Sequence, residues 1–438
     1  MKFHIHTYGC QMNVRESEAV EALLLAAGHE RVAGEEDAEL VIVNSCTVRQ
    51  KAEEKALGKA GNLLAAGKIT GVMGCAVKRL GADIFRRLGS LHFAVGPRRF
   101  SEIPSIVEKI ISVPASVRPR RIADFGDNEV PSGLGAHPVR KPTGTFADVQ
   151  SFVTVMIGCD NRCSYCIVPD VRGHEWCRPA EEIIAEVKCL ASRGVKEVCL
   201  LGQSVLSYKD GSFAFPDLLR EVQKIDGISR IRFTSAHPSG CTDALIAAYR
   251  DCDKVCRHLH LPVQSGSDRV LAQMGRRYTA EEYLSAVAKM RALDPEFSVT
   301  TDVIVGYPGE SEEDFEMTRA LMEKALFDNA FIFKYSPRPG TKSAQLPDDV
   351  PTGEKERRNQ ILLADQERRG VERNSRLVGT VRSVLVEGPS KRNAQRWSGR
   401  DSGNRIVAFE PPAGISVGDM LEVRITEAHA QVLIGEVV

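Results

Sequence analysis

The chain has 438 residues, of which 43% are hydrophobic and 26% charged, and this composition is typical of a globular protein with two or three domains. Lys+Arg and Asp+Glu both number 58, so any nucleic-acid surface has to be local. The N-terminal stretch has no apolar signal core and no apolar run could span a bilayer, which predicts a cytoplasmic protein. Twelve cysteines in such a chain indicate metal or redox roles rather than disulfides.

Strand and helix patterns alternate over residues 1–111. The runs FHIHTY, LVIVN and ITGVM are each followed by a helical pattern, which predicts an α/β domain with a parallel sheet. A cysteine stands at or just past the end of each run, at Cys10, Cys46 and Cys75. Because the C-terminal ends of parallel strands gather along one edge, three thiols separated by 36 and 29 residues can meet there. The alternative is three buried core cysteines.

A second domain is expected over residues 149–370, after a linker at 112–148 that contains five prolines. In this second domain the alternation of strands and helices resumes six times, and a polar helical connector follows. Six βα units predict a partial (β/α)6 barrel, in which the chemistry lies beyond the C-terminal ends of the strands. The predicted strands are 152–157, 197–201, 230–235, 257–263, 298–306 and 330–336.

Three cysteines follow the first of these strands in the run Cys159-Asp-Asn-Arg-Cys163-Ser-Tyr-Cys166. Closed thiolate sites take four ligands, whether they hold zinc or an iron–sulfur cluster. Three thiolates therefore either borrow a fourth ligand or leave one coordination position open for chemistry. His174 or Cys177 can complete a zinc site, and this alternative stays open.

The tail, residues 371–438, changes to alternating β-rich runs with Gly and Pro turns, which predict a small antiparallel β-barrel. Residues 373–405 hold eight Lys or Arg and only two acids, so this stretch is basic although the net charge of the whole chain is zero. Phosphate contacts are largely electrostatic, and a tryptophan offers a stacking surface for a base. The candidate RNA contacts are Lys391, Arg392, Arg396, Trp397 and Arg400, with a solvated loop as the alternative.

Stretches along essentially the whole chain resemble the methylthiotransferase family of radical S-adenosylmethionine enzymes. They include TYGCQMNVRESE, NSCTVRQKAEEK, GCDNRCSYCIVP, HLHLPVQSGSDRVL, MGRRYTAEEY and TTDVIVGYPGE, while VEGPSKRN and SGRDSGNRIVAF resemble the MiaB branch most. The resemblance implies an N-terminal methylthiotransferase domain, a radical S-adenosylmethionine partial barrel and a TRAM RNA-binding barrel. It also implies a transferase that adds a methylthio group to C2 of N6-isopentenyladenosine in tRNA, next to the anticodon.

The same resemblance implies two [4Fe–4S] clusters and S-adenosylmethionine as cofactors. Cys10, Cys46 and Cys75 would hold one cluster, and the catalytic trio Cys159, Cys163 and Cys166 the other, whose open iron takes S-adenosylmethionine. For Tyr165 the alternative is packing against the barrel, and for Arg277 a surface ion pair. The glycines of the GYPGE loop would permit close approach of a ligand. Further cofactor contacts are expected at Tyr165, Gly202, Gln203, Ser235, His237, Gln264, Ser265, Arg277 and Asp302.

The implied reaction needs a cofactor, because an adenine C2–H bond is strong and barely acidic and no side-chain base removes that hydrogen. The base has to reach a buried centre, which predicts that it is extruded from its stack. The expected partners are a tRNA anticodon stem-loop, S-adenosylmethionine, a reductant such as flavodoxin or ferredoxin, and a sulfur donor. The alternatives are methylthiolation of threonylcarbamoyl-adenosine in tRNA or of a ribosomal-protein aspartate, and a non-catalytic iron–sulfur RNA-binding protein.

Overall fold

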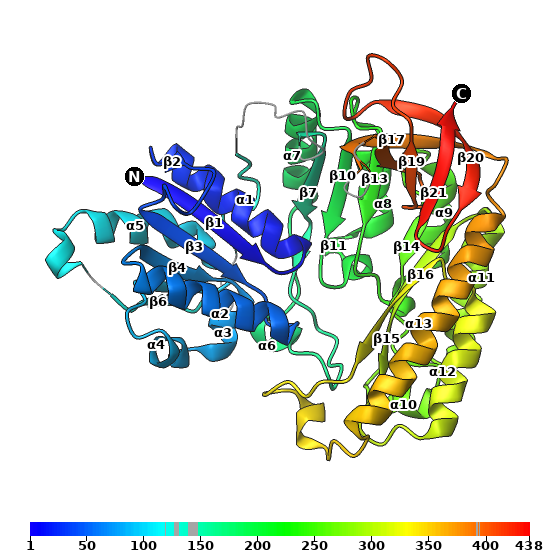
Figure 1. Cartoon of the computed structure of the whole chain (residues 1–438), viewed down its shortest axis with the longest axis horizontal. Coiled ribbons are helices and arrows are strands. Elements are labelled where there is room, and N and C mark those ends of the chain that lie inside the picture. Colours follow the sequence, from blue (N-terminus) through cyan, green and yellow to red (C-terminus); the bar gives the residue numbers. More distant parts are fainter. Residues whose placement is uncertain (119, 127–130, 139–147, 391–392, 394) are drawn as a thin grey trace.

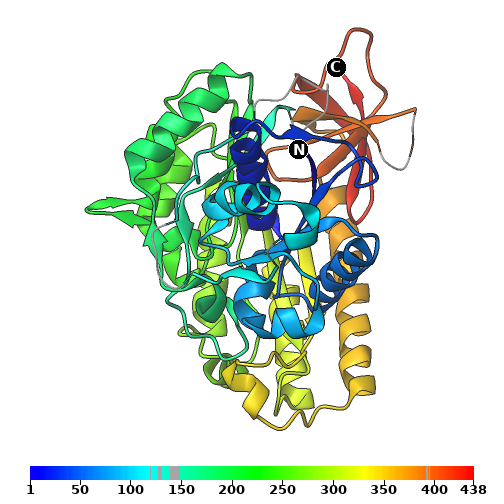
Figure 2. The same cartoon turned by 90° about the vertical axis from the view of Figure 1, so that its left-hand side faces the viewer.

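The computed structural model describes residues 1–118, 120–126, 131–138, 148–390, 393 and 395–438. They form an N-terminal α/β domain, a central open barrel and a small C-terminal β-barrel, which follow one another along the chain (Figure 1). Turned by 90°, the N-terminal domain lies in front of the central barrel, so the two are stacked face to face (Figure 2). Among the described helices, none combines the length and the apolar character that crossing a bilayer requires.

The N-terminal domain is built on a six-stranded, all-parallel sheet in the order β2-β1-β3-β4-β5-β6. Its central strands are buried on both faces, as a parallel sheet requires. Helices α1 and α5 cover one face, and α2, α3 and α4 cover the other. The strands are β1 (Lys2–Tyr8), β2 (Glu30–Arg31), β3 (Leu40–Ser45), β4 (Ile69–Met73), β5 (Phe93–Val95) and β6 (Ile122–Asp124). The helices are α1 (Gln11–Ala26), α2 (Gln50–Ala65), α3 (Cys75–Leu80), α4 (Asp83–Arg87) and α5 (Ile103–Ile111), with short 3₁₀ turns η1 (Phe100–Glu102) and η2 (Ala115–Val117).

The stretch that we expected to be a linker contributes to this domain. Strand β6 lies within it and pairs with β5 at the edge of the sheet. Further along, Leu134 is buried in the domain's core, and Arg15 donates hydrogen bonds to the carbonyl oxygens of Leu134 and Ala136. Residues 122–124 and 134–136 are thus fixed to the domain, although their proline-rich surroundings resemble a linker.

The central domain contains the six predicted parallel strands, arranged as two groups, β13-β10-β7 and β14-β15-β16. A bridge between Ile231 and Val255 joins the groups, so the ring runs from β7 to β16 and is open between them in the described residues. The strands are β7 (Gln150–Thr154), β10 (Glu197–Leu201), β13 (Arg230–Phe233), β14 (His258–His260), β15 (Ser298–Val305) and β16 (Asn329–Lys334). The helices are α6 (Val168–Arg172), α7 (Ala180–Ser192), α8 (Phe215–Val222), α9 (Asp243–Asp251), α10 (Asp268–Gln273), α11 (Ala280–Leu293) and α12 (Glu312–Ala325). Short elements complete it: β8 (Met156–Ile157) paired with β9 (Trp176–Cys177), the hairpin β11 (Lys209–Asp210) and β12 (Phe213–Ala214), and the 3₁₀ turns η4 (Val205–Ser207), η5 (Pro238–Gly240) and η6 (Lys342–Gln345).

The N-terminal domain fills part of the open barrel. Alternate residues of β7 and β10, namely Phe152, Cys199 and Leu201, turn away from the barrel's own helices and join the core beneath α1. Helix α1 lies against β7, where Met12 contacts Thr154. The first half of the ring is therefore packed by a neighbouring domain, while the inner side of β14–β16 faces a cavity.

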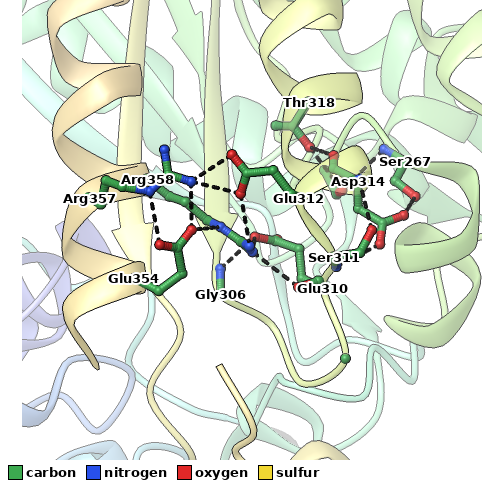
Figure 3. A network of polar contacts seen from close by, with 12 residues as sticks. Ser267, Gly306, Glu310, Ser311, Glu312, Asp314, Thr318, Glu354, Arg357 and Arg358 are labelled. Carbon is green, nitrogen blue, oxygen red and sulfur yellow. Dashed lines mark hydrogen bonds and ion pairs between the residues drawn. The ribbon is translucent and has the colours of Figure 1, made fainter. Parts of the chain in front are cut away.

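A long connector helix, α13 (Thr352–Ser375), runs beside β16 and α12, and ion pairs hold it to α12 and to the loop before α12 (Figure 3). Arg358 Nη1 contacts Glu310 Oε1 at 2.6 Å, and Arg357 Nη2 contacts Glu312 Oε1 at 2.6 Å. Glu310 Oε1 also accepts a hydrogen bond from the Gly306 amide at 2.9 Å. A Cβ on Gly306 would lie 2.3 Å from Lys355 Cγ, so in the GYPGE loop this glycine makes room for α13 rather than for a ligand.

The C-terminal domain is a closed five-stranded barrel in the order β17-β18-β19-β21-β20. Four of its five pairings are antiparallel as expected, but β19 and β21 run parallel. It docks on the N-terminal ends of the central strands: Arg230 donates to Ser383 O and Arg232 to Asp401 O, both at 2.7 Å. The strands are β17 (Val381–Pro389), β18 (Trp397–Arg400), β19 (Ile406–Phe409), β20 (Met420–Ala428) and β21 (Val432–Val437).

Candidate active site

Three cysteines of the N-terminal domain lie at the ends of three neighbouring strands. Cys10 caps α1 just after β1, Cys46 directly follows β3, and Cys75 opens α3 after β4. These strands are adjacent in the sheet, so the three cysteines follow the ends of neighbouring strands at one edge. Burial raises the pKa of Cys46, and the nearby Cys10 adds to this effect. Burial likewise raises the pKa of Cys75 to about 12.

The sequence shapes the backbone around these thiols. Gly74 has φ +97°, and a Cβ there would lie 2.5 Å from Asn44 Oδ1, so only glycine fits between β3 and Cys75. Asn13 Nδ2 donates to Asn44 Oδ1 at 2.9 Å, and Asn44 Nδ2 donates to Asn13 O at 2.8 Å. This buried amide pair joins the start of α1 to the end of β3 and fixes Cys10 relative to Cys46.

Arg172 brings a positive charge from the central domain to these thiols. It ends α6, and its Nη1 contacts the buried Glu16 of α1 at 2.7 Å. Cys75 packs against Ile167 and Val171 of the same segment. Burial opposes the charged form of Arg172, but Cys75, Glu16 and Cys10 outweigh it and raise its pKa. Sequence reasoning did not select Arg172; its place six residues after Cys166 was the only signal.

The second trio, Cys159, Cys163 and Cys166, lies in the loop that follows β8. The loop is fixed at its start, where the Gly158 amide donates to Gln203 Oε1 at 2.6 Å and the Cys159 amide donates to Gly173 O at 3.1 Å. Burial raises the pKa of Cys159, and it raises that of Cys166 to about 12. Asn161 Nδ2 lies 3.5 Å from Cys159 Sγ.

Arg276 contacts the middle thiol of this trio. Its Nη1 lies 3.6 Å from Cys163 Sγ, and its other nitrogens donate to Pro262 O at 2.8 Å and Tyr278 Oη at 2.9 Å. We expected Arg277 to contact a cofactor carboxylate, but Arg277 is exposed, whereas Arg276 is buried beside Cys163. The motif MGRRY contains both arginines, and the sequence alone does not show which of them turns inward.

The donor chemistry of both trios fits an iron–sulfur cluster. Each consists of soft thiolates without a carboxylate among them, which suits iron–sulfur centres. In the described part of the chain, no three His, Cys, Asp or Glu side chains are placed to hold a single metal ion. The residues that would complete a zinc site have other contacts: His174 Nδ1 pairs with Asp160 at 2.7 Å, and Cys177 Sγ accepts from the Lys209 amide at 3.3 Å.

Two expected cofactor contacts have a backbone conformation that suits a binding site. Ser235 and Gln264 follow β13 and β14, and their φ angles are +63° and +70°. Non-glycine residues with positive φ are strained, and such strain is concentrated where ligands bind. Gln264 is held in this conformation by main-chain hydrogen bonds with Asp302 and Ile304 of β15, each 2.9 Å long.

The remaining expected contacts lie in several environments. Gly202 is buried against Met156, and Gln203 holds the cysteine loop through the Gly158 amide. Ser265 is fully buried and its hydroxyl lies 3.2 Å from Thr318 Oγ1, so it joins α12 instead of facing the cavity.

The two ring-bearing candidates, Tyr165 and His237, also have protein partners. Tyr165 packs against Val270, Met274 and Tyr307, which agrees with the alternative that it packs against the barrel. The ring of His237 lies 5.7 Å from that of Tyr278; burial, and then the charge of Arg276, lower the pKa of His237 to about 4.

A cavity of about 550 Å³ lies where the three domains meet. The N-terminal domain contributes Cys10 and Cys46, and the inner side of the central barrel contributes Ser235, Asp302 and neighbouring residues. The C-terminal barrel closes it with the end of β18 and the loop that follows, including Arg400 and Asn404. Cys75 and the second trio are not among the described residues that line it. The cavity therefore brings two of the six cysteines, two cofactor candidates and one RNA candidate together.

The candidate RNA contacts divide between the cavity and the surface. Arg400 lines the cavity, and its Nε donates to Glu387 Oε1 at 2.7 Å. Trp397 is half-buried and packs against the core of the C-terminal barrel, while Arg396 is half-buried in the preceding turn. Lys391 and Arg392 lie outside the described residues.

Comparison with known proteins assigns each part of the chain. Residues 153–322 match the radical SAM superfamily, residues 375–438 the TRAM domain, and residues 2–96 an uncharacterized protein family, UPF0004. Among solved structures, the radical S-adenosylmethionine methyltransferase TsrM from Kitasatospora setae has a TM-score of 0.56 at 14% identity, covering 87% of this chain and 78% of TsrM. At that identity the likeness shows the fold alone. Fold and matches together define a three-domain radical SAM protein.

Full-length relatives narrow this class to one family. A tRNA-2-methylthio-N(6)-dimethylallyladenosine synthase from Opitutus terrae is 41% identical over 468 residues, covering 99% of this chain and 97% of the relative. The synthase of the same name from Syntrophus aciditrophicus is 42% identical over 446 residues, with 99% and 94% covered. The chain belongs to this family of radical SAM methylthiotransferases. Membership confirms the expected family, the transferase class, and S-adenosylmethionine and [4Fe–4S] clusters as cofactors.

Proposed function

We propose that this chain adds a methylthio group to C2 of N6-dimethylallyladenosine in tRNA, next to the anticodon. The name of its relatives supports the substrate. The observation that carries the proposal is the shared cavity, because it joins Cys10 and Cys46 to the inner side of a radical SAM barrel and to a TRAM loop. A base that enters this cavity lies near the thiols of Cys10 and Cys46, near the cofactor candidates on the barrel's inner side, and near the guanidinium of Arg400.

In this proposal Cys159, Cys163 and Cys166 hold the cluster that binds S-adenosylmethionine, and Cys10, Cys46 and Cys75 hold a second cluster. When bound, these groups would supply the electron and the radical chemistry for removing the C2 hydrogen, and the sulfur for the methylthio group. The residues of the protein position these groups relative to one another. Gln203 fixes the start of the cysteine loop, Arg276 contacts Cys163, and the strained Ser235 and Gln264 present polar groups at the strand ends.

In this proposal the C-terminal barrel binds the RNA backbone. Arg400 lies at the cavity, so a phosphate beside the extruded base meets a guanidinium there, and Arg396 and Trp397 extend the contact. Lys391 and Arg392 are proposed as RNA contacts from the sequence alone. The enzyme acts in the cytoplasm, where a flavodoxin or ferredoxin provides electrons and a separate donor provides sulfur.

The test uses the full chain, reconstituted anaerobically with iron and sulfide, and an anticodon stem-loop that carries N6-dimethylallyladenosine. Mass spectrometry of the nucleosides should show a gain of one methylthio group, together with 5′-deoxyadenosine. Cys163→Ala should abolish both products. Cys46→Ala should abolish methylthiolation while some 5′-deoxyadenosine formation survives. Modification of a threonylcarbamoyl stem-loop or of a ribosomal protein in place of this RNA would refute the proposed substrate.

A further inference from the structure

Two phenylalanine rings stand open to the cavity on one face of β16. Phe331 is 48% exposed and Phe333 40% exposed, and both line the cavity. No other phenylalanine in the described residues is exposed. Large aromatic side chains are normally buried, so two of them side by side on a cavity wall indicate a place that an apolar group covers.

The surroundings of the rings show what kind of molecule fits. The ring of His260 lies edge-on to Phe331 at 5.9 Å, and Asp302 and Asn329 are close by in the same lining. Beneath the strand, Ile332 packs against the barrel's core and its carbonyl accepts from Asn359 Nδ2 at 3.0 Å, so β16 is fixed in place. An occupant therefore has one apolar part on an otherwise polar body, which is the make-up of most small-molecule sites.

We propose that Phe331 and Phe333 form the subsite that recognises the branched five-carbon substituent on N6 of the substrate adenine. The inference rests on the proposed function and names residues that determine its specificity. On a purine the C2–H and C6–N6 bonds point in different directions. A base that turns C2 toward the wall with Cys10 and Cys46 thus directs its N6 substituent to another wall, and β16 supplies the apolar one.

This subsite also rejects the two nearest competitors. Unmodified adenosine has no N6 substituent to cover the two rings, so both rings stay exposed to water and add no binding free energy. Threonylcarbamoyl-adenosine carries a carboxylate, and placing that charge against two phenyl rings would desolvate it without a partner. A site of this kind distinguishes ligands mainly by apolar contact, which limits discrimination to roughly 10- to 200-fold per small apolar group.

The experiment uses three anticodon stem-loops that differ only in the N6 substituent: none, dimethylallyl, or threonylcarbamoyl. For the reconstituted full chain and the variants Phe331→Ala, Phe333→Ala and Phe333→Leu, one measures kcat/KM of methylthiolation and the RNA dissociation constant. Met317→Ala serves as the matched control, because Met317 is 53% exposed on α12, away from the cavity lining.

The wild type and the control should prefer the dimethylallyl RNA. Each alanine variant should lose that preference by about tenfold through a higher KM, while Phe333→Leu keeps most of it and iron content stays unchanged. A preference that survives in both alanine variants overturns this inference and leaves the proposed function intact. Equal loss on all three RNAs also overturns it, because the rings would then serve the fold. If the wild type modifies none of the RNAs, the proposed function itself fails.

Discussion

The buried pair Arg172–Glu16 ties the central domain to the N-terminal domain and allows a quantitative prediction. The two side chains are 4% and 2% exposed, and their nearest atoms are 2.7 Å apart. Replacing Arg172 with glutamine leaves the Glu16 carboxylate buried without its cation. Such a loss costs about 3–5 kcal/mol, whereas the double variant Arg172→Gln/Glu16→Gln, which buries no charge, should cost markedly less.

The structure gives a reason for expecting the smaller loss in the double variant. In the described part of the chain, Arg172 Nη2 and Glu16 Oε2 are both buried without a hydrogen-bond partner. The pair is thus only partly satisfied, and neutral amides avoid that desolvation. Each single substitution leaves one charged side chain buried without its partner. The attraction that normally offsets the cost of burying that charge is then lost.

The pH dependence of the Arg172→Gln variant follows from Glu16. Burial already raises the pKa of Glu16, and removing the opposing charge of Arg172 raises it further. A carboxyl whose pKa is higher in the folded state binds more protons there, so stability falls as pH rises through that pKa. The penalty of Arg172→Gln should therefore be largest near pH 8 and shrink toward pH 5.

The assay can use tryptophan fluorescence, since the chain has two tryptophans and Trp176 packs against the core shared by the two domains. In a Trp397→Phe background, urea unfolding of the two single variants and the double variant, compared at equal iron content, gives the coupling free energy. If the two single substitutions simply add, or if the penalty of Arg172→Gln does not change with pH, the proposed role of the pair is wrong.

Three further predictions concern the rest of the molecule. Asp314→Asn should lower the free energy of unfolding by about 2–3 kcal/mol, because its carboxylate accepts from Ser267 Oγ at 2.5 Å (Figure 3) and pairs with Arg269. Burial opposes ionisation of Asp314, but these bonds outweigh it and hold its pKa well below the usual value. The difference from wild type in urea titrations should therefore begin to shrink as pH falls below about 4 and vanish only below the depressed pKa of the folded state. Arg276→Met should change the electron paramagnetic resonance spectrum and lower the potential of the S-adenosylmethionine-binding cluster, since a cation beside Cys163 is lost, whereas Arg277→Met should change neither. Arg400→Ala should weaken RNA binding and reduce the slope of log K against log salt by about one, as expected for one lost phosphate contact; an unchanged slope would show that Arg400 serves only Glu387.

Much of the fold and part of the site followed from local patterns in the sequence. The period of apolar residues predicted the six strands of the central barrel, and a cysteine after each of three N-terminal strands predicted their shared edge. Both features could be predicted because each depends on a pattern among residues that are close together in the sequence. Arg172 and Glu16, by contrast, are 156 residues apart, and no local pattern connects them. The inward turn of Arg276 and the burial of Ser265 against Thr318 likewise depend on loop paths that only the packed structure fixes.

The open ring explains why three domains are needed for one cavity. Six strands leave the barrel open between β7 and β16, so its inner side cannot be covered by its own side chains alone. Helix α1 covers the inner side of β7 and β10, which places Cys10 and Cys46 beside the uncovered half. The C-terminal barrel seals the end where the strands begin, through Arg232 and Arg405, opposite the end that carries the second cysteine trio. In the proposed function, an RNA bound at the C-terminal barrel reaches Cys10 and Cys46 through this cavity.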